Sequence, residues 1–572
     1  MKNFIKKKYS YFFILVILIF PLDAYSKNTN IKYTNGNISN YFLGIISANQ
    51  NYANKAYKYL NKVKSLKNIH PNYNTQFIRT LVLLDKFEQA FSFSKDLEKE
   101  GKLFFEADLL LGLEYFINKD YKNAKKHFQR LSVNENYYGF FQGFFDNFLL
   151  SVVEAAENNQ KESFKFLNKT PKRYQNLKLI QDSFLQCYFN TPKTIESFKK
   201  LTRDKNFNFS RYNFFLANYL LHKNKKLEAK KIIKEGREKH DSNLLIKQSE
   251  NFILNGKINK VKNFFNCENL EDSIAEIFYI IANLYSTEEN YQLSNFYLKI
   301  SYFFNNKFTP NKTLLAENFF YQKKFQSSKK IYNIIKKVGP VYSWHASKRI
   351  AVILSNTEGD DKAVLKLKNE FDLLKNPNFE QYYELANFHK DRKYFKESIK
   401  YYTLVLENIE KNHYLIAKVL DRRGTSYERV GDWKKAEKDL KDSLKLEPDQ
   451  AHVLNYLAYS WIEKRIHQEK ALTMLEKAVK LKANDGYIID SLGWAHYLNK
   501  NYADAEKFLQ IAVELKPMDP VICSHYADAL WMVKKNIQAR YIWQHVLSLK
   551  NVSDELRSDI NKKLILGITK KL

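Results

Sequence analysis

The segment from Gly486 to Pro517 reads "GYIIDSLGWAHYLNKNYADAEKFLQIAVELKP". Within it, Gly493, Ala505 and Pro517 stand at intervals of twelve residues. Small residues at the first two positions allow two helices to cross closely, and Leu509 fills the space beside the crossing. Pro517 ends the second helix, because proline lacks an N–H group and disfavours helix in the residue before it. The segment therefore predicts a helix-turn-helix unit.

The same spacing recurs along the chain. The place of the first small residue returns every 34 or 35 residues in three runs, at positions 44, 78 and 112, at 282, 316, 351 and 386, and at 424, 458, 493 and 527, and only position 78 holds a large residue, Ile78. The pattern is degenerate around positions 151, 185 and 249, so we expect about twelve clear repeats and up to three weak ones. The matching small residues and prolines are Gly44 with Ala56, Gly112 with Ala124, Ala217 with Ala229, Ala282 with Ser294, Ala316 with Ser328 and Pro340, Ala351 with Ala363, Ala386 with Ser398, Gly424 with Ala436 and Pro448, Ala458 with Ala471, and Ala527 with Ala539.

At this register the sequence resembles the tetratricopeptide repeat family, whose unit is a helix-turn-helix of 34 residues. The segment "DSLGWAHYLNKNYADAEKFLQIAVELKP" is a close match, and His496 departs from it at a place where the family usually has tyrosine. The resemblance implies an all-α fold, an α-solenoid in which paired helices stack into a right-handed superhelix. A single unit cannot bury its own apolar face, whereas stacked units can.

The predicted organisation has five parts. Residues 1–26 form a signal peptide, 27–37 a linker, 38–270 a basic and partly degenerate set of N-terminal repeats, 271–552 the C-terminal repeats, and 553–572 a capping helix with a tail. The cap begins at Ser553 and has Glu555 in its first turn, which is typical of a helix start. It would cover the last apolar face of the array.

The N-terminus has the layout of a secretory signal. Lysines precede the apolar run from Tyr11 to Phe20, and the small residues Ala24 and Ser26 follow it. The run is about half of the ~20 residues that a spanning helix needs, so cleavage after Ser26 is favoured over a retained anchor. The first cysteine is Cys187, which argues against a lipid anchor. We expect an exported protein of the periplasm or cell envelope.

Three cysteines, Cys187, Cys267 and Cys523, make an odd number in a chain with this leader. A disulfide scaffold would have a dense and even set. Buried free thiols are one interpretation. A bridge between Cys187 and Cys267 is the other, and it would require Cα atoms within ~7 Å of each other.

The formal net charge of +31 favours anionic partners. Residues 411–550 hold 23 Lys and Arg against 18 Asp and Glu, so most of the excess lies upstream. An anionic membrane surface or an acidic glycan could therefore bind the N-terminal repeats, although a Lys- and Asn-heavy composition on helix exteriors is the favoured explanation of the charge. Nucleic acid is not expected as a partner of an exported chain.

No catalytic or cofactor-binding motif occurs. The sequence lacks GxGxxG, GxxxxGK, HExxH and G-x-S-x-G patterns. Its twelve histidines show no zinc-ligand spacing. His452, His496 and His525 lie in similar parts of first helices, where packing or solvation is the usual role. We therefore expect no catalytic residue, no metal, no cofactor and no enzyme activity.

The family resemblance also implies a contact surface on the first helices, along the concave side of the solenoid. Its principal residues, called here the predicted contact surface, are Asn455, Tyr459, Ile462, Tyr487, Asp490, Trp494, Tyr497, Asp528 and Trp531, with Leu498, Ser524 and Met532 beside them. Large aromatic residues with few polar groups suit a peptide or a helix. In the alternative, Trp494 and Trp531 wedge between neighbouring repeats and never meet a ligand.

A carboxylate clamp of the kind known in the family is a poor match here. Lys418, Arg422 and Asn455 supply suitable groups, but Asp421 would repel a carboxylate. The sequence thus favours a protein-interaction scaffold that binds a protein or peptide partner. The alternative is an envelope protein that docks on membrane or polysaccharide through its basic N-terminal repeats.

Overall fold

A computed structural model describes residues 33–133, 141, 143–203, 211–239 and 242–568. Every regular element among these residues is a helix, and no strand occurs in them. The predicted signal peptide at 1–26 lies outside the described residues. The chain divides into two compact units, with unit 1 ending at Ile353 and unit 2 beginning at Leu354, so the boundary falls within the helix α20 (Pro340–Glu358), whose bounds are given with unit 1. This division falls later than residue 270, where the sequence places the change between its two sets of repeats.

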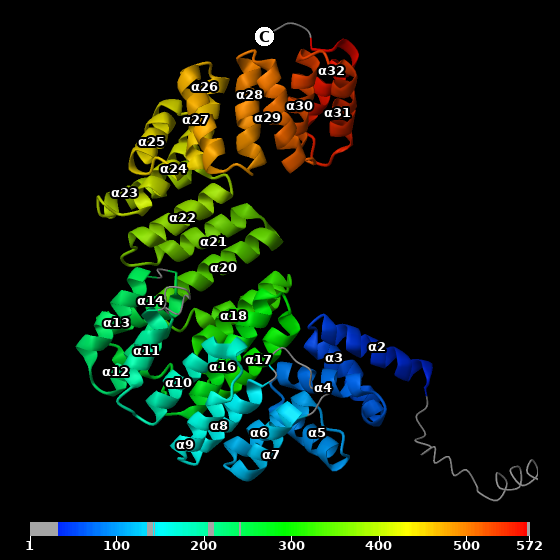
Figure 1. Cartoon of the computed structure of the whole chain (residues 1–572), viewed down its shortest axis with the longest axis vertical. Helices are drawn as coiled ribbons and strands as arrows, with labels where there is room; N and C mark the ends of the chain where they lie inside the picture. Colours follow the sequence, from blue (N-terminus) through cyan, green and yellow to red (C-terminus); the bar gives the residue numbers. More distant parts are fainter. Residues whose placement is uncertain (1–32, 134–140, 142, 204–210, 240–241, 569–572) are drawn as a thin grey trace, which may run out of the picture. The chain divides into compact units, whose positions relative to one another are not determined.

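Unit 1 consists of helices that follow one another in antiparallel pairs (Figure 1). Their bounds are α2 (Asn35–Asn49), α3 (Ala53–Leu60), α4 (Pro71–Leu83), α5 (Phe87–Lys99), α6 (Phe105–Ile117), α7 (Tyr121–Val133), α8 (Phe145–Ala156), α9 (Gln160–Asn168), α10 (Gln175–Tyr188), α11 (Thr194–Arg203), α12 (Tyr212–His222), α13 (Lys226–Lys239), α14 (Leu244–Leu254), α15 (Ile258–Lys262), α16 (Leu270–Thr287), α17 (Tyr291–Phe304), α18 (Thr309–Tyr321), α19 (Phe325–Ile335) and α20 (Pro340–Glu358), with 3₁₀ turns at Asn61–Asn68 and Lys172–Tyr174. Residues 35–37 of the predicted linker thus belong to α2.

Unit 2 continues the pattern and ends with a single helix. Its helices are α21 (Asp360–Asp372), α22 (Phe379–Asp391), α23 (Phe395–Asn408), α24 (Leu415–Arg429), α25 (Trp433–Leu446), α26 (Ala451–Glu463), α27 (Gln468–Leu481), α28 (Gly486–Leu498), α29 (Tyr502–Leu515), α30 (Pro520–Met532), α31 (Asn536–Ser548) and α32 (Asp554–Leu566). The helix α32 is the predicted cap, and the Ser553 hydroxyl accepts a hydrogen bond from the Leu556 backbone N–H at its start.

The small residues that set the repeat lie where the two helices of each pair touch. All the signature alanines are fully buried. A Cβ atom added to Gly493 would come within 2.6 Å of Leu509, and one added to Gly112 within 2.3 Å of Phe128. Distances this short leave no room for a side chain. The close approach predicted from the spacing is confirmed.

Serine at the second small position adds a hydrogen bond to this contact. The Ser328 hydroxyl donates to the carbonyl oxygen of Ala316 at 2.9 Å, and Ser294 donates to Ala282 at 2.7 Å. Ser163 makes the same bond to Ser151 at 2.7 Å, in a region where the sequence pattern is degenerate. The α8–α9 pair is therefore a repeat of the same geometry, although its small residues are both serine.

The turns inside the pairs share one backbone feature. A residue with positive φ stands between the two helices, and it is usually Lys, Asn, Asp or Glu instead of glycine. These turn residues are Asn51, Asp85, Lys119, Asn158, Asn190, Asn224, Glu289, Lys323, Lys393, Arg465, Lys500 and Lys534, whose φ angles lie between 48° and 66°. Many of them are spaced as the repeat is. The left-handed conformation closes the turn in each unit.

The prolines of the repeat do not all act alike. Pro448 and Pro517 follow the last residues of α25 and α29, as predicted. Pro340 instead begins α20, while α19 has already ended at Ile335. Proline is well suited to the first helical position, where its missing N–H group would have no partner within the helix.

Unit 1 closes on itself. Helix α4 packs against α17, although more than ten helices separate them in the chain (Figure 1). Gln292 of α17 donates to the side-chain oxygen of Gln76 in α4 at 2.7 Å, and Lys299 pairs with Asp85 at 2.6 Å. The first repeats of the unit are thereby fixed to its later repeats. This long-range contact, called here the seam, was not predicted from the sequence.

A single aromatic-rich core runs through unit 1. Phe145 of α8 contacts Phe278 of α16 and Tyr297 of α17, with ring centroids 6.0 Å and 5.8 Å away. Phe141 contacts Tyr285 at 5.9 Å. The inner faces of these repeats are therefore filled by the unit's own side chains.

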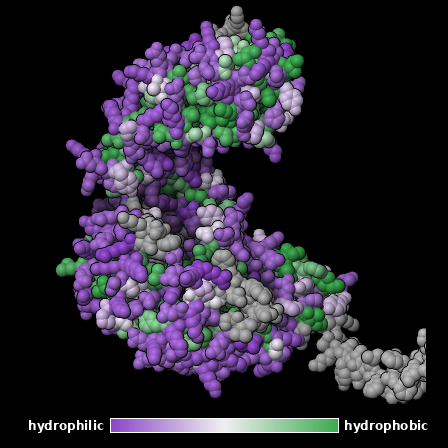
Figure 2. Space-filling model, viewed as in Figure 1, coloured by the Kyte–Doolittle hydropathy of each residue, from purple (hydrophilic) through white to green (hydrophobic). Residues whose placement is uncertain are grey.

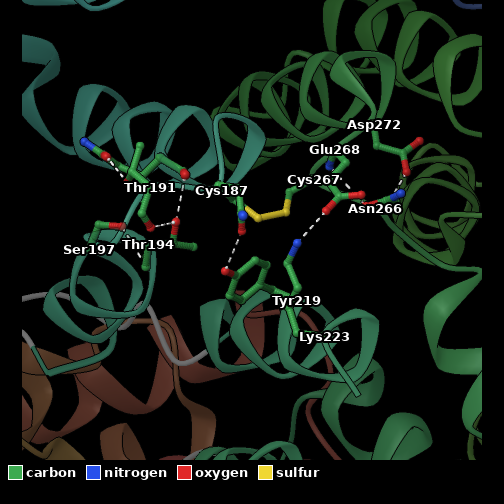
Figure 3. Close-up of a disulfide and its surroundings, with 12 residues drawn as sticks. Cys187, Thr191, Thr194, Ser197, Tyr219, Lys223, Asn266, Cys267, Glu268 and Asp272 are labelled. Atoms are coloured by element: carbon green, nitrogen blue, oxygen red, sulfur yellow. Dashed lines mark hydrogen bonds and ion pairs between the residues drawn. A yellow bond between two sulfur atoms is a disulfide. The ribbon is translucent and has the colours of Figure 1, made fainter. Parts of the chain in front are cut away.

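A disulfide joins Cys187, in α10, to Cys267, in the loop before α16 (Figure 3). The two Cα atoms are 5.9 Å apart, which satisfies the distance condition, and 80 residues separate the cysteines. Lys223 and Glu268 form an ion pair of 3.0 Å nearby. The alternative of free thiols therefore does not apply to this pair, whereas Cys523 is free and buried.

The face shown in Figure 2 is mostly hydrophilic, with hydrophobic residues at the end formed by α2. Phe42, Leu43 and Ile46 of this helix are each about half exposed, because no described repeat precedes them. None of the described helices is long and apolar enough to cross a membrane.

Candidate partner-binding surface

The predicted contact surface lies on three first helices of unit 2. Helix α26 packs against α28, and α28 packs against α30, so their side chains meet in neighbouring layers. In each pair the second helix supports the first through the buried small residues described above. The repeat thus holds the first helices of successive pairs side by side.

Trp494 links all three first helices. Its indole Nε1 donates to Glu463 of α26 at 2.9 Å. Its ring stacks on Tyr497 at 4.6 Å and on His525 of α30 at 3.9 Å between centroids. His525 Nδ1 in turn lies 2.9 Å from the Asp490 carboxylate of α28. Trp494 is therefore largely a packing residue between repeats, with part of its surface still exposed.

Asp528 and Trp531 belong to the end of the array. Asp528 accepts from the Trp543 indole at 3.0 Å and from Lys563 of α32 at 2.7 Å. Burial raises the pKa of the Asp528 carboxyl, and these two donors oppose that rise. The Trp531 ring packs on Trp543, and Gly567 lies so close that a Cβ there would be 2.1 Å from the indole. Asp528 and Trp531 thus hold the capping helix α32 in place.

The burial of the predicted residues divides them into two groups. Ile462, Asp490, Tyr497 and Asp528 are buried, so they position their neighbours and present no surface to a partner in this arrangement. Tyr487 is 54% exposed, and the remaining residues are partly exposed: Asn455, Tyr459, Trp494 and Trp531. Leu498 and Met532 are also partly exposed, whereas Ser524 is buried.

Asn455 carries an unused hydrogen-bonding group. Its side-chain oxygen is buried and accepts no hydrogen bond from the described residues. Tyr459 lies four residues later on the same face of α26, where burial raises the pKa of its hydroxyl group. A buried carbonyl without a donor costs free energy, so a ligand N–H would be favourable there.

The three histidines that lie in similar parts of first helices each contact a different residue. His452 lies 3.1 Å from Asp421, His496 stacks on Phe508, and His525 pairs with Asp490. The contact of His525 with Trp494 was not predicted, because position along one helix does not reveal partners on the next. Each histidine has a separate local contact.

The possible carboxylate clamp is already engaged in other contacts. Arg422 donates to the Asn387 side-chain oxygen at 2.7 Å, and the buried Asp421 carboxylate lies 3.1 Å from His452. In the part of the chain that the structure describes, no group of three or more His, Cys, Asp or Glu is arranged to hold a metal ion.

Comparison with known proteins gives one sequence match. A curated TPR repeat-containing protein of Pseudomonas aeruginosa is 34% identical over 110 residues, which are 19% of this chain and 18% of that relative. The matched part thus spans about a fifth of the relative's length. No protein-family model matches the chain.

Several solved structures are similar at low scores. They include MamA from Desulfovibrio magneticus RS-1 (TM-score 0.28, 19% identity, 32% of this chain and 99% of that one), the yeast protein Tom70 (0.34, 15%, 79% and 93%) and the Cut9–Hcn1 hetero-tetramer of the APC/C (0.32, 13%, 80% and 96%). With TM-scores this low, these likenesses carry no argument about function.

Three observations agree with one another: the period of 34 or 35 residues, the small residues at the helix crossings, and the match to a TPR repeat-containing protein. The repeating helix pairs of this chain are therefore similar to tetratricopeptide repeats.

Proposed function

We propose that this protein is an interaction scaffold that binds a peptide or protein partner along the first helices α26, α28 and α30. The observation that carries the proposal is the unpartnered Asn455 oxygen beside the partly exposed Tyr459, with Tyr487 exposed on the next first helix. A peptide backbone supplies the N–H donor, and aromatic rings supply apolar contact area. Several repeats would share the binding energy.

The test places a photo-crosslinking amino acid at Tyr487, with Tyr541 on the second helix α31 as the matched position. Tyr541 is 72% exposed, so accessibility alone would favour it. We expect a defined adduct from position 487 and none from 541. Equal crosslinking at both positions would contradict the proposal.

A second experiment uses Asn455→Ala, compared with Asn499→Ala at the end of α28. Loss of one hydrogen bond to a partner should weaken binding about fivefold to tenfold. Thermal stability should stay unchanged, because the Asn455 oxygen has no partner within the described chain. Unchanged affinity for the crosslinked partner would remove Asn455 from the binding surface.

We further propose that the protein works outside the cytoplasm, in the periplasm or cell envelope. The Cys187–Cys267 bridge supports this location, since stable disulfides form in oxidising compartments. Thiol labelling of freshly lysed cells tests it: a protein isolated with both cysteines reduced would count against export.

A further inference from the structure

A polar hollow of about 520 Å³ lies at the seam of unit 1, where the turn of the first helix pair meets the turns of two consecutive later pairs, α16–α17 and α18–α19. Its size is within the range of roughly 300–1,000 Å³ that is typical of small-molecule sites. Its lining residues define what we call the seam pocket: Asn49, Gln50, Asn51, Tyr52, Glu289, Asn290, Tyr291, Gln292, Gln322 and Lys324.

The seam pocket depends on the closure of the unit. Asn51 stands in the turn between α2 and α3, Glu289 in the turn between α16 and α17, and Gln322 at the end of α18. Gln292 bonds to the carbonyl of Ala48 at 3.2 Å and so fixes the first turn to α17. Lys324 donates to the Gln50 carbonyl from the third turn.

Two lining side chains have polar atoms without partners. The Asn51 side-chain oxygen and the Gln322 side-chain nitrogen are buried, and neither makes a hydrogen bond to a described residue. One is an acceptor and the other is a donor. Orphan polar atoms are few in native proteins, and a pair of opposite character in one hollow indicates a ligand with adjacent donor and acceptor groups.

The lining chemistry selects among ligands. Six of the ten residues carry carboxamides, and no Leu, Ile, Val, Met or Phe is present, so the seam pocket has no anchor site for an apolar peptide side chain. The single lysine is balanced by Glu289. The Lys324 amine already donates to the Gln50 carbonyl and lies over the Tyr52 ring.

Aromatic rings complete the site. Tyr52 is 46% exposed, and the Lys324 amine lies 4.2 Å from its ring centroid. Tyr291 stacks in parallel on Tyr321 at 6.5 Å. A half-exposed ring beside carboxamides suits a molecule with one apolar face and a rim of hydroxyl groups. We propose that the seam pocket binds a neutral sugar ring, held by the Asn51 and Gln322 side chains and covered on one face by Tyr52.

This inference is independent of the proposed function, because the seam pocket lies in unit 1 and the contact surface lies in unit 2. The experiment is saturation-transfer NMR on the purified full chain, with glucose and N-acetylglucosamine as separate probes. Acetate serves as the anion probe and triglycine as the peptide probe. We expect transfer to at least one sugar and little transfer to acetate or triglycine.

The variant is Asn51→Gly combined with Gln322→Ala. Glycine tolerates the φ of 58° at position 51, so the turn is kept while the acceptor is removed. Asn224→Gly is the matched control, since Asn224 occupies the same kind of turn with φ 60° and does not line the seam pocket. The double variant should bind the sugar about tenfold more weakly, and the control should match the wild type.

Three results would overturn the proposal. They are no transfer to either sugar, sugar transfer that is unchanged in the double variant, or stronger transfer to acetate or triglycine that the double variant abolishes. Equal thermal unfolding of wild type and both variants confirms that binding, and not folding, is compared.

Discussion

The ring of Phe303 in α17 stacks on the ring of Phe87 in α5, with centroids 4.2 Å apart and planes inclined by 27°. Phe303 also meets Phe91 edge-on at 6.1 Å. These contacts extend the polar bonds between α17 and α4, so one stretch of α17 holds the first repeats of unit 1 through both aromatic and charged groups.

Phe303→Ala is expected to loosen this seam. Loss of a partly exposed aromatic contact should cost about 1–2 kcal/mol, and amides of α4 and α5 should exchange with solvent faster. Phe325→Ala is the control, because its ring packs on Phe320 of neighbouring α18. Hydrogen exchange measured by mass spectrometry checks the result, and equal exchange in α4 and α5 of both variants would show that the seam does not stabilise them.

Gly112→Ala should destabilise unit 1 by about 1–3 kcal/mol, because the new Cβ would overlap the Phe128 ring. Gly36→Ala is the matched control in α2. Its nearest atom is 3.9 Å from an added Cβ, so it should be neutral or slightly stabilising. Thermal unfolding compares the two. Similar losses in both variants would mean that helix crossing is looser than described.

The double variant Cys187→Ser and Cys267→Ser should lower the stability of unit 1 by about 2–4 kcal/mol, because the bridge closes a long loop. Reductant should lower the unfolding temperature of the wild type toward that of the variant and leave the variant unchanged. Cys523→Ala is the control, since this thiol is unpaired. A variant still sensitive to reductant would contradict the assigned pairing.

Ionisation of the Asp272 carboxyl should lower the free energy of unfolding of unit 1 as the pH rises. Burial raises the pKa of its carboxyl to about 7, helped by Glu271 and opposed by the Asn266 backbone N–H and Lys307. The folded protein therefore keeps a proton that the unfolded chain has lost, and stability falls between about pH 4 and pH 7. Compared with Asp272→Asn, the wild type should lose about 1–2 kcal/mol more between pH 5 and pH 7 in urea unfolding. Parallel curves for the two proteins would refute this assignment.

Trp531→Ala should cost more stability than Trp494→Ala, because Trp531 is enclosed by Trp543 and the residues after α32. We expect about 3 kcal/mol for Trp531 and less for the more open Trp494. Helical circular dichroism during heating measures both. A larger loss of stability for Trp494→Ala than for Trp531→Ala would indicate that Trp531 is a surface residue that could contact a partner.

The helix pairs were predictable because their signal is local. Gly493 and Ala505 lie within one unit, and close helix crossing needs small residues at that spacing. The pair at Ser151 and Ser163 was harder to find, since serine is not a distinctive residue until its hydroxyl is seen to bond across the helices. The left-handed conformation in the turns was not predicted, because Lys500 and Lys534 adopt a backbone conformation that is more usual for glycine.

The contact surface stays a prediction, and the sequence did not predict the burial of some of its residues. Asp490 contacts His525 and Asp528 contacts Lys563, both of which come from following helices. A register within one repeat does not show which side chain of the next repeat will reach across.

From the sequence alone, spacing determined the repeating unit, its paired helices and its capping end, because each depends on residues close together in the chain. Tertiary structure alone decided the closure of unit 1, the disulfide and the seam pocket. These require residues such as Phe87 and Phe303 to meet after many helix pairs have stacked, and small rotations between successive pairs accumulate in a way that no single repeat encodes.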